Sequence, residues 1–153
     1  MCEHCGCRGN EAIAELMDEH FVLMDLADQV RRHLQREDRA GAVTTVEKLG
    51  GLLLRHVARE ERGVFAALKD QGDFADAVEE LEAEHLTFDI QLDELDPESP
   101  TFADEVRAML DDLVTHIDKE NLGVFPVAVV TLGARGWAIV DAAREAETSP
   151  LPA

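Results

Sequence analysis

The chain has 153 residues, 46% of them hydrophobic, which suits a single domain with a buried core. Its 33 acidic against 14 basic residues give a formal net charge of −19, which argues against nucleic acid or an anionic membrane surface as a partner, because both bind mainly through Lys and Arg. There is no apolar run of about 18 residues and no hydrophobic signal segment, so we expect a soluble, cytoplasmic protein.

Apolar residues recur at alternating intervals of three and four along four segments, which is the spacing of one face of a helix packed in a bundle. The composition also favours helices, since tyrosine is absent and only 5% of the residues are aromatic. The four predicted helices cover residues 13–34, 46–67, 78–95 and 102–123.

Short breaks rich in Gly, Pro and Asp separate these helices at residues 36–41, 70–73 and 96–101. Connections this short join antiparallel neighbours. We therefore predict an all-α fold, an up-down-up-down antiparallel four-helix bundle with a short additional C-terminal helix.

The end of the chain is interrupted twice, by Pro126, which should kink or restart the fourth helix, and by a Gly-containing break at 133–136. The additional helix is predicted over residues 137–147. We divide the chain into a Cys-rich N-terminal segment (1–9), the helical bundle (10–147) and a frayed tail (148–153) with two prolines.

Each of the four predicted helices carries one histidine in its apolar face: His20, His56, His85 and His116. Residues on antiparallel neighbours lie at one height when the midpoint of their numbers falls in the connecting turn. The three midpoints are residue 38, between 70 and 71, and between 100 and 101, all within or beside the predicted breaks. We expect the histidines to share one layer, joined by Glu60 and Glu120, each one turn beyond a histidine.

An internal repeat supports this layer. Residues 56–65 align without gaps to residues 116–125 and match at His, Glu, Gly, Val and Phe. The first and third helices repeat more weakly, as Glu-His at 19–20 and at 84–85. The chain therefore looks like two related helical hairpins, and such a pseudo-twofold arrangement suits a site for two metal ions.

Burying six such residues in one layer costs free energy that other interactions must offset. An ionised carboxylate or an unpaired imidazole in a bundle interior costs several kcal/mol, and a lone histidine there is more often a hydrogen-bonded core residue. Metal ions provide the compensation, because carboxylates bridge two cations and imidazoles bind one each. We predict a metal site formed by His20, His56, Glu60, His85, His116 and Glu120.

This pattern resembles the hemerythrin-like family, also called the HHE cation-binding domain, over roughly residues 10–130. The resemblance lies in the order and spacing of the six residues: one histidine, a His-x-x-x-Glu motif, a second histidine and a second such motif. It implies two iron ions in a non-haem centre with an oxo or hydroxo bridge. Glu60 and Glu120 are then bridging carboxylates, and the four histidines are terminal ligands.

The sequence departs from the oxygen-carrying members of that family. Those have a fifth histidine one turn beyond the third-helix histidine, where this chain has Asp89, and a fourth-helix motif with one more residue before an Asp. Asp89 is either a further ligand or a solvent-facing carboxylate. With four histidines, more coordination positions are open to water or substrate, which favours reactivity over reversible oxygen carriage.

These features lead us to expect a di-iron protein that binds or reacts with a small diatomic or peroxide ligand (oxygen, peroxide or nitric oxide) in sensing, storage or detoxification. The His-x-x-x-Glu form is also similar to that of di-iron proteins that repair iron-sulfur clusters under stress. The alternatives are an iron donor or repair factor for such clusters, or a redox-inert metal-storing bundle. The sequence does not decide whether the protein is an enzyme, and it does not indicate a redox partner.

The N-terminal segment offers a second group of candidate ligands, Cys2, His4, Cys5 and Cys7. Three cysteines in seven residues cannot form a disulfide framework for the domain, so they suggest a reducing compartment. They are an additional metal site, a redox pair between Cys2 and Cys5, or incidental residues of a loose tail.

Overall fold

The computed structural model describes residues 6–152, and all the regular structure in that range is helical, which confirms the predicted all-α class. After a 3₁₀ turn, η1 (Cys7–Gly9), the α-helices are α1 (Glu11–Gln35), α2 (Arg39–Glu60), α3 (Ala66–Gln71), α4 (Ala75–Glu94), α5 (Phe102–Lys119), α6 (Phe125–Thr131) and α7 (Ala134–Ala146). None of these helices, within the described range, is both long and apolar enough to cross a membrane.

Two π-helical turns join successive α-helices without a break. One, η2 (Glu61–Phe65), lies between α2 and α3, and the other, η3 (Glu120–Val124), lies between α5 and α6. Pro126 lies in the first turn of α6, directly after η3. Because proline has no backbone N–H to donate to the preceding turn, the interruption predicted at Pro126 lies beside this π turn. Single π turns inside helices are frequent at functional sites.

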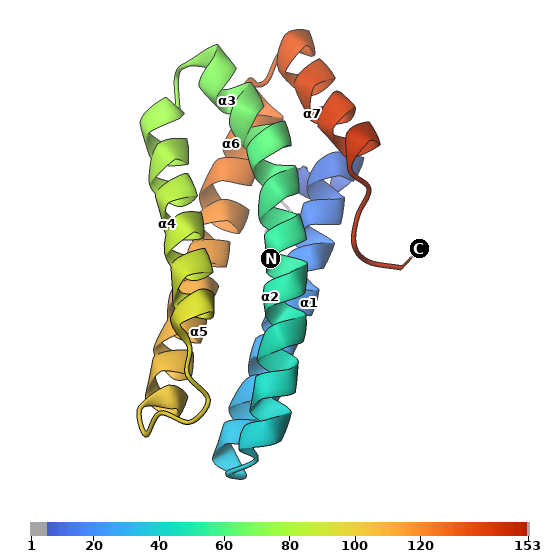
Figure 1. Ribbon diagram of the computed structural model, residues 1–153. Helices are drawn as coiled ribbons and strands as arrows, with labels where there is room; N and C mark the ends of the chain where they lie inside the picture. Colours follow the sequence, from blue (N-terminus) through green and yellow to red (C-terminus); the bar gives the residue numbers. More distant parts are fainter. Residues whose placement is uncertain (1–5, 153) are drawn as a thin grey trace.

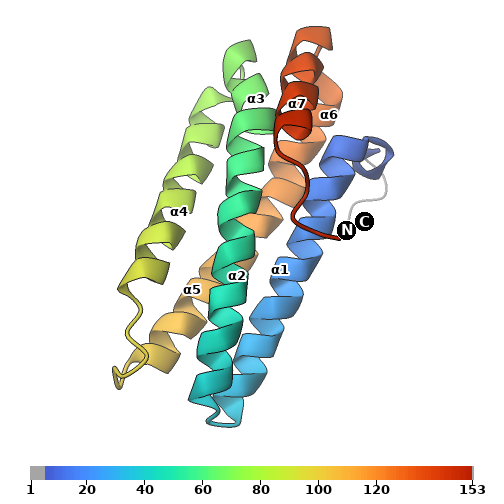
Figure 2. The same cartoon turned by 45° about the vertical axis from the view of Figure 1, so that its right-hand side comes forward.

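The long helices lie side by side in pairs of opposite direction. Figures 1 and 2 show α1 beside α2 and α4 beside α5, each pair joined by a short connection. Asp38 fixes the first connection, because its side chain accepts a hydrogen bond from the backbone N–H of Gly41 and caps α2. The last helix, α7, packs on η2 and α3.

The apolar core consists of two clusters that lie on either side of a polar layer. On α1, the buried apolar residues between 12 and 17 belong to one cluster and those between 23 and 34 to the other, with His20 between them. The same order is found on α2 and its continuation, where His56 and Glu60 separate Leu53 from Val64. The polar layer is therefore bounded on two sides by apolar side chains, which offer it no hydrogen bonds.

Candidate metal centre

The six residues that the sequence predicts for one layer meet in the structure. Glu60 and Glu120 have no exposed surface, and the four histidines are between 1% and 5% exposed. The Nε2 atoms of His56 and His116 each lie 2.9 Å from a carboxylate oxygen one turn further along the same helical run. The Nε2 atom of His20 lies 3.0 Å from Glu120 across the interior.

The ligand atoms form two overlapping groups. One group contains His20 and His56, the other contains His85 and His116, and both contain Glu60 and Glu120. Within each group the candidate ligand atoms all lie within 4.8 Å of one another. Each group could hold a cation, and both carboxylates are common to the two groups.

Most of these buried atoms have no hydrogen bond within the described part of the chain. Those without a partner are His20 Nε2, His56 Nε2 and both oxygens of Glu60 and of Glu120. Although the atoms are close, their angles do not suit hydrogen bonds, and unsatisfied buried polar atoms are costly. Imidazole nitrogens and carboxylate oxygens that converge in this way fit divalent cations such as iron, manganese or zinc.

Each histidine is held by an acceptor on the opposite side of its ring. Glu19, Glu61 and Glu84 accept from the Nδ1 atoms of His56, His85 and His116 at 2.7, 2.9 and 2.7 Å. The Oδ1 atom of Asn121 does the same for His20 at 2.8 Å. Since Nδ1 then carries the proton, the Nε2 lone pair faces the centre, which is the usual arrangement of metal-binding histidines.

The repeat described above explains how the rings are fixed. Phe65 stacks on His85, and Phe125 stacks on His20, with ring centroids 5.5 and 5.4 Å apart. Each phenylalanine comes from one hairpin and covers a histidine of the other. The shared Phe of the two motifs therefore has the same role in both halves of the site.

Four acceptors in the outer layer were not predicted. Glu19 and Glu84 precede the histidines of α1 and α4, and Glu61 and Asn121 follow the central glutamates. The weak Glu-His repeat at 19–20 and 84–85 contained a signal for the first two, because its recurrence has no explanation in core packing. The last two lie at equivalent positions in the long repeat but differ in residue type.

Glu19 is buried in a network that reaches the end of the chain. It has no exposed surface, pairs with the buried guanidinium of Arg59, and accepts a 2.7 Å hydrogen bond from Ser149. Arg59 also donates to the backbone carbonyl of Glu147. The tail, which we expected to be frayed, is thus held against the outer side of His56.

Burial and charge act in opposite directions on the ionisable groups of the centre. Burial lowers the pKa of His20 and of His85, but attraction to Glu120 and Glu60 outweighs it and raises both pKa values to about 10. For Glu120, burial and the nearby Glu60 raise the pKa, yet the histidines bring it down to about 2. Protons on the imidazoles therefore balance the carboxylates when no cation does so.

The other candidate ligands lie outside this cluster. Asp89 is exposed, and its carboxylate belongs to neither group of converging ligand atoms. Cys2, His4 and Cys5 lie outside the described residues. Cys7 is buried against the core and disulfide-bonded, and a sulfur in a disulfide offers no thiolate to a metal ion.

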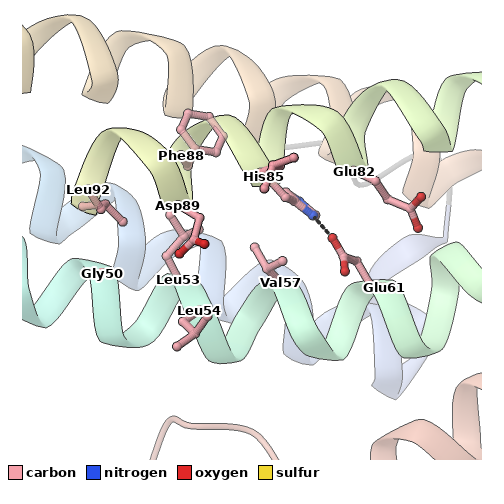
Figure 3. A pocket seen from close by; sticks show the side chains of 11 residues that line it. Gly50, Leu53, Leu54, Val57, Glu61, Glu82, His85, Phe88, Asp89 and Leu92 are labelled. Carbon is pink, nitrogen blue, oxygen red and sulfur yellow. Dashed lines mark hydrogen bonds and ion pairs between the residues drawn. The ribbon is translucent and has the colours of Figure 1, made fainter. Parts of the chain in front are cut away.

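A groove of about 460 Å³ between α2 and α4 reaches the edge of the centre. Its walls are mainly aliphatic, with Leu53, Leu54 and Val57 on α2 facing Leu92 on α4. Figure 3 shows the hydrogen-bonded pair of His85 and Glu61 at one end of this groove. The groove therefore connects solvent to the His85 side of the cluster.

Comparison with known proteins agrees with the residue pattern. Residues 11–128 match the family described as hemerythrin HHE cation binding domain. Neither curated proteins nor solved structures give a match to this chain.

The pKa shifts predict how stability varies with pH in protein stripped of metal by a chelator. Because folding raises the pKa of His20 and His85 from 6.5 to about 10, their protonation stabilises the fold fully below pH 6.5, and this contribution is lost as pH rises towards 10. The contribution of Glu120 is present above pH 4.5 and is lost as pH falls towards 2.

We therefore expect the Tm of the stripped protein, measured by circular dichroism, to be highest between pH 4.5 and 6.5 and to fall above that range. Saturating Fe²⁺ under anaerobic conditions should reduce the alkaline fall, because the cation replaces the protons. A Tm that stays constant from pH 6.5 to about 9 would contradict the pKa assignment.

Proposed function

Because the chain belongs to the hemerythrin HHE cation-binding domain family, we propose that it is a non-haem di-iron protein that binds or reacts with oxygen, peroxide or nitric oxide. One observation carries this proposal: two groups of four ligand residues share Glu60 and Glu120. Di-iron and di-manganese centres in helical bundles are likewise built from Glu and His side chains that project inward from facing helices. Such reactivity serves sensing, storage or detoxification.

In this proposal the Nε2 atoms of two histidines would hold each iron, Glu60 and Glu120 would serve as the shared carboxylates, and solvent would supply an oxo or hydroxo bridge. Bound iron supplies the redox chemistry, since non-haem iron exchanges electrons with oxygen species. The protein binds and orients the metal through the Nδ1 acceptors. Its two apolar clusters exclude water from either side of the layer.

We propose that the helices form an up-down-up-down four-helix bundle, with α7 as the additional C-terminal helix. Support comes from the opposite directions of α1 and α2 and of α4 and α5 (Figure 1). Further support comes from cross-hairpin contacts at the centre, such as Phe125 on His20. In such a bundle a metal site is built from side chains on facing helices.

The groove between α2 and α4 is the proposed entry route for the small molecule. It is open to solvent, mostly aliphatic, and ends at the His85 and Glu61 pair (Figure 3). Apolar walls suit an uncharged diatomic molecule, which loses little hydration on entering, and hydrogen peroxide carries no charge that such walls would exclude. Glu61, Glu82 and Asp89 give the groove a negative rim that disfavours anions.

Metal analysis combined with an optical titration tests the di-iron proposal. We expect about two irons per chain after expression with iron supplied and a near-ultraviolet absorption band in the oxidised protein. The reduced protein, titrated anaerobically, should change its spectrum with oxygen, peroxide or nitric oxide. Glu60→Gln should lose iron because it removes a shared carboxylate, whereas the exposed control Glu79→Gln should retain it.

The other functions give different results in the same titration. A colourless protein with bound metal that responds to none of the three ligands would indicate a redox-inert store. Iron that is released readily to an acceptor would indicate an iron donor for cluster assembly or repair. Zero iron in wild-type protein would contradict the proposal itself.

Narrowing the groove tests the entry route. Val57→Trp places a large ring beside the His85 and Glu61 pair, so the rate of reaction with nitric oxide or peroxide should fall by about tenfold while the iron content stays the same. Stopped-flow absorbance measures the rate. Val130→Trp, at a position 78% exposed on α6, is the matched control and should react at the wild-type rate. Equal rates for all three proteins would exclude this route.

A further inference from the structure

The two cation positions are built from equivalent ligands but have different surroundings. Both use two imidazoles and the shared carboxylates of Glu60 and Glu120. The difference lies in the groups that accept from the Nδ1 atoms. The inference drawn from it rests on the proposed function, since it needs two cations in these positions.

Two of the four Nδ1 acceptors are of the same kind in the two cation positions. His56 donates to Glu19, and His116 donates to Glu84, both at 2.7 Å. These acceptors come from equivalent helices, α1 and α4, and each precedes the histidine of its own helix. The pair therefore gives the two positions the same kind of charged hydrogen bond.

The other two Nδ1 acceptors, those of His85 and His20, differ between the positions. Glu61 and Asn121 lie at equivalent positions of the repeat, and each accepts from a histidine of the other hairpin. The acceptor of His85 is a carboxylate at 2.9 Å, whereas the acceptor of His20 is a neutral amide at 2.8 Å. The His85 position therefore has one more negative charge directly behind a ligand.

Neighbouring basic side chains increase this difference in charge between the two positions. The side chain of Arg59, which pairs with Glu19, is 4% exposed, while the side chain of Lys119, which pairs with Glu84, is 44% exposed. A buried charge is screened less than an exposed one. Arg59 therefore offsets the charge of Glu19 more fully than Lys119 offsets that of Glu84.

We propose that the cation position of His85 and His116 binds a divalent metal more tightly than that of His20 and His56, and that Glu61 against Asn121 sets the difference. A carboxylate behind an imidazole increases its basicity and stabilises the bound cation electrostatically. The tighter position is also the one beside the groove. Iron is therefore held more firmly at the position that a small molecule entering by the groove reaches first.

Variants that each keep one position measure the difference directly. His56→Ala keeps the ligands His85 and His116, and His116→Ala keeps His20 and His56. Anaerobic calorimetric titration with Fe²⁺ should give a Kd about tenfold lower for His56→Ala, in the range found for loss of an outer hydrogen-bond partner. Equal Kd values for the two variants would overturn the proposal.

Two isosteric exchanges then assign the cause. In the His56→Ala protein, Glu61→Gln should weaken Fe²⁺ binding by about tenfold, and in the His116→Ala protein, Asn121→Asp should strengthen it by about the same factor. Glu82→Gln is the matched control, because Glu82 lines the same groove but pairs with Lys69 rather than a histidine. An effect of Glu82→Gln as large as that of Glu61→Gln would contradict a role through His85.

If a histidine variant does not fold, the same two exchanges can be measured in protein that keeps all four histidines. Glu61→Gln alone should weaken the tighter of the two binding steps, and Asn121→Asp alone should strengthen the weaker one. If Glu61→Gln changes only the weaker step, the proposal fails. Absence of Fe²⁺ binding in the wild-type protein would instead refute the di-iron function, so the two failures are distinguishable.

Discussion

Two buried carboxylates at the centre of the protein set the requirement that the rest of the structure meets. Glu60 and Glu120 are fully enclosed, and the apolar clusters on either side supply no hydrogen bonds to them. An ionised carboxylate in such surroundings is stable only with positive charge beside it. Protons on His20 and His85, or cations held by the four imidazoles, bring that charge. The Nδ1 acceptors and the stacked phenylalanines keep the rings in position.

The two hairpins depend on each other at this centre. The acceptor of His85 comes from the first hairpin and that of His20 from the second. Each stacking phenylalanine likewise covers a histidine of the other hairpin. Neither hairpin therefore has a complete set of supported ligands. Packing of the hairpins and formation of the metal centre are coupled, so bound metal should stabilise the contact between them.

The ligand layer could be predicted from the sequence, because helical periodicity and the positions of the turns determine the height of each histidine. The outer acceptors could not, because they depend on where a side chain lies around the helix, and Glu61 and Asn121 lie within or at the start of π turns that a regular helical pattern does not reveal. The bond from Ser149 to Glu19 spans 130 residues and had no local signal. Asp89 lies one turn from His85 but faces the groove.

The most direct test of this account is anomalous X-ray diffraction from crystals of the iron-loaded protein, measured at the iron absorption edge. The account predicts two iron peaks within about 4 Å of each other, one beside His20 and His56 and one beside His85 and His116, with Glu60 and Glu120 between them. A single peak, or iron bound away from these carboxylates, would contradict it.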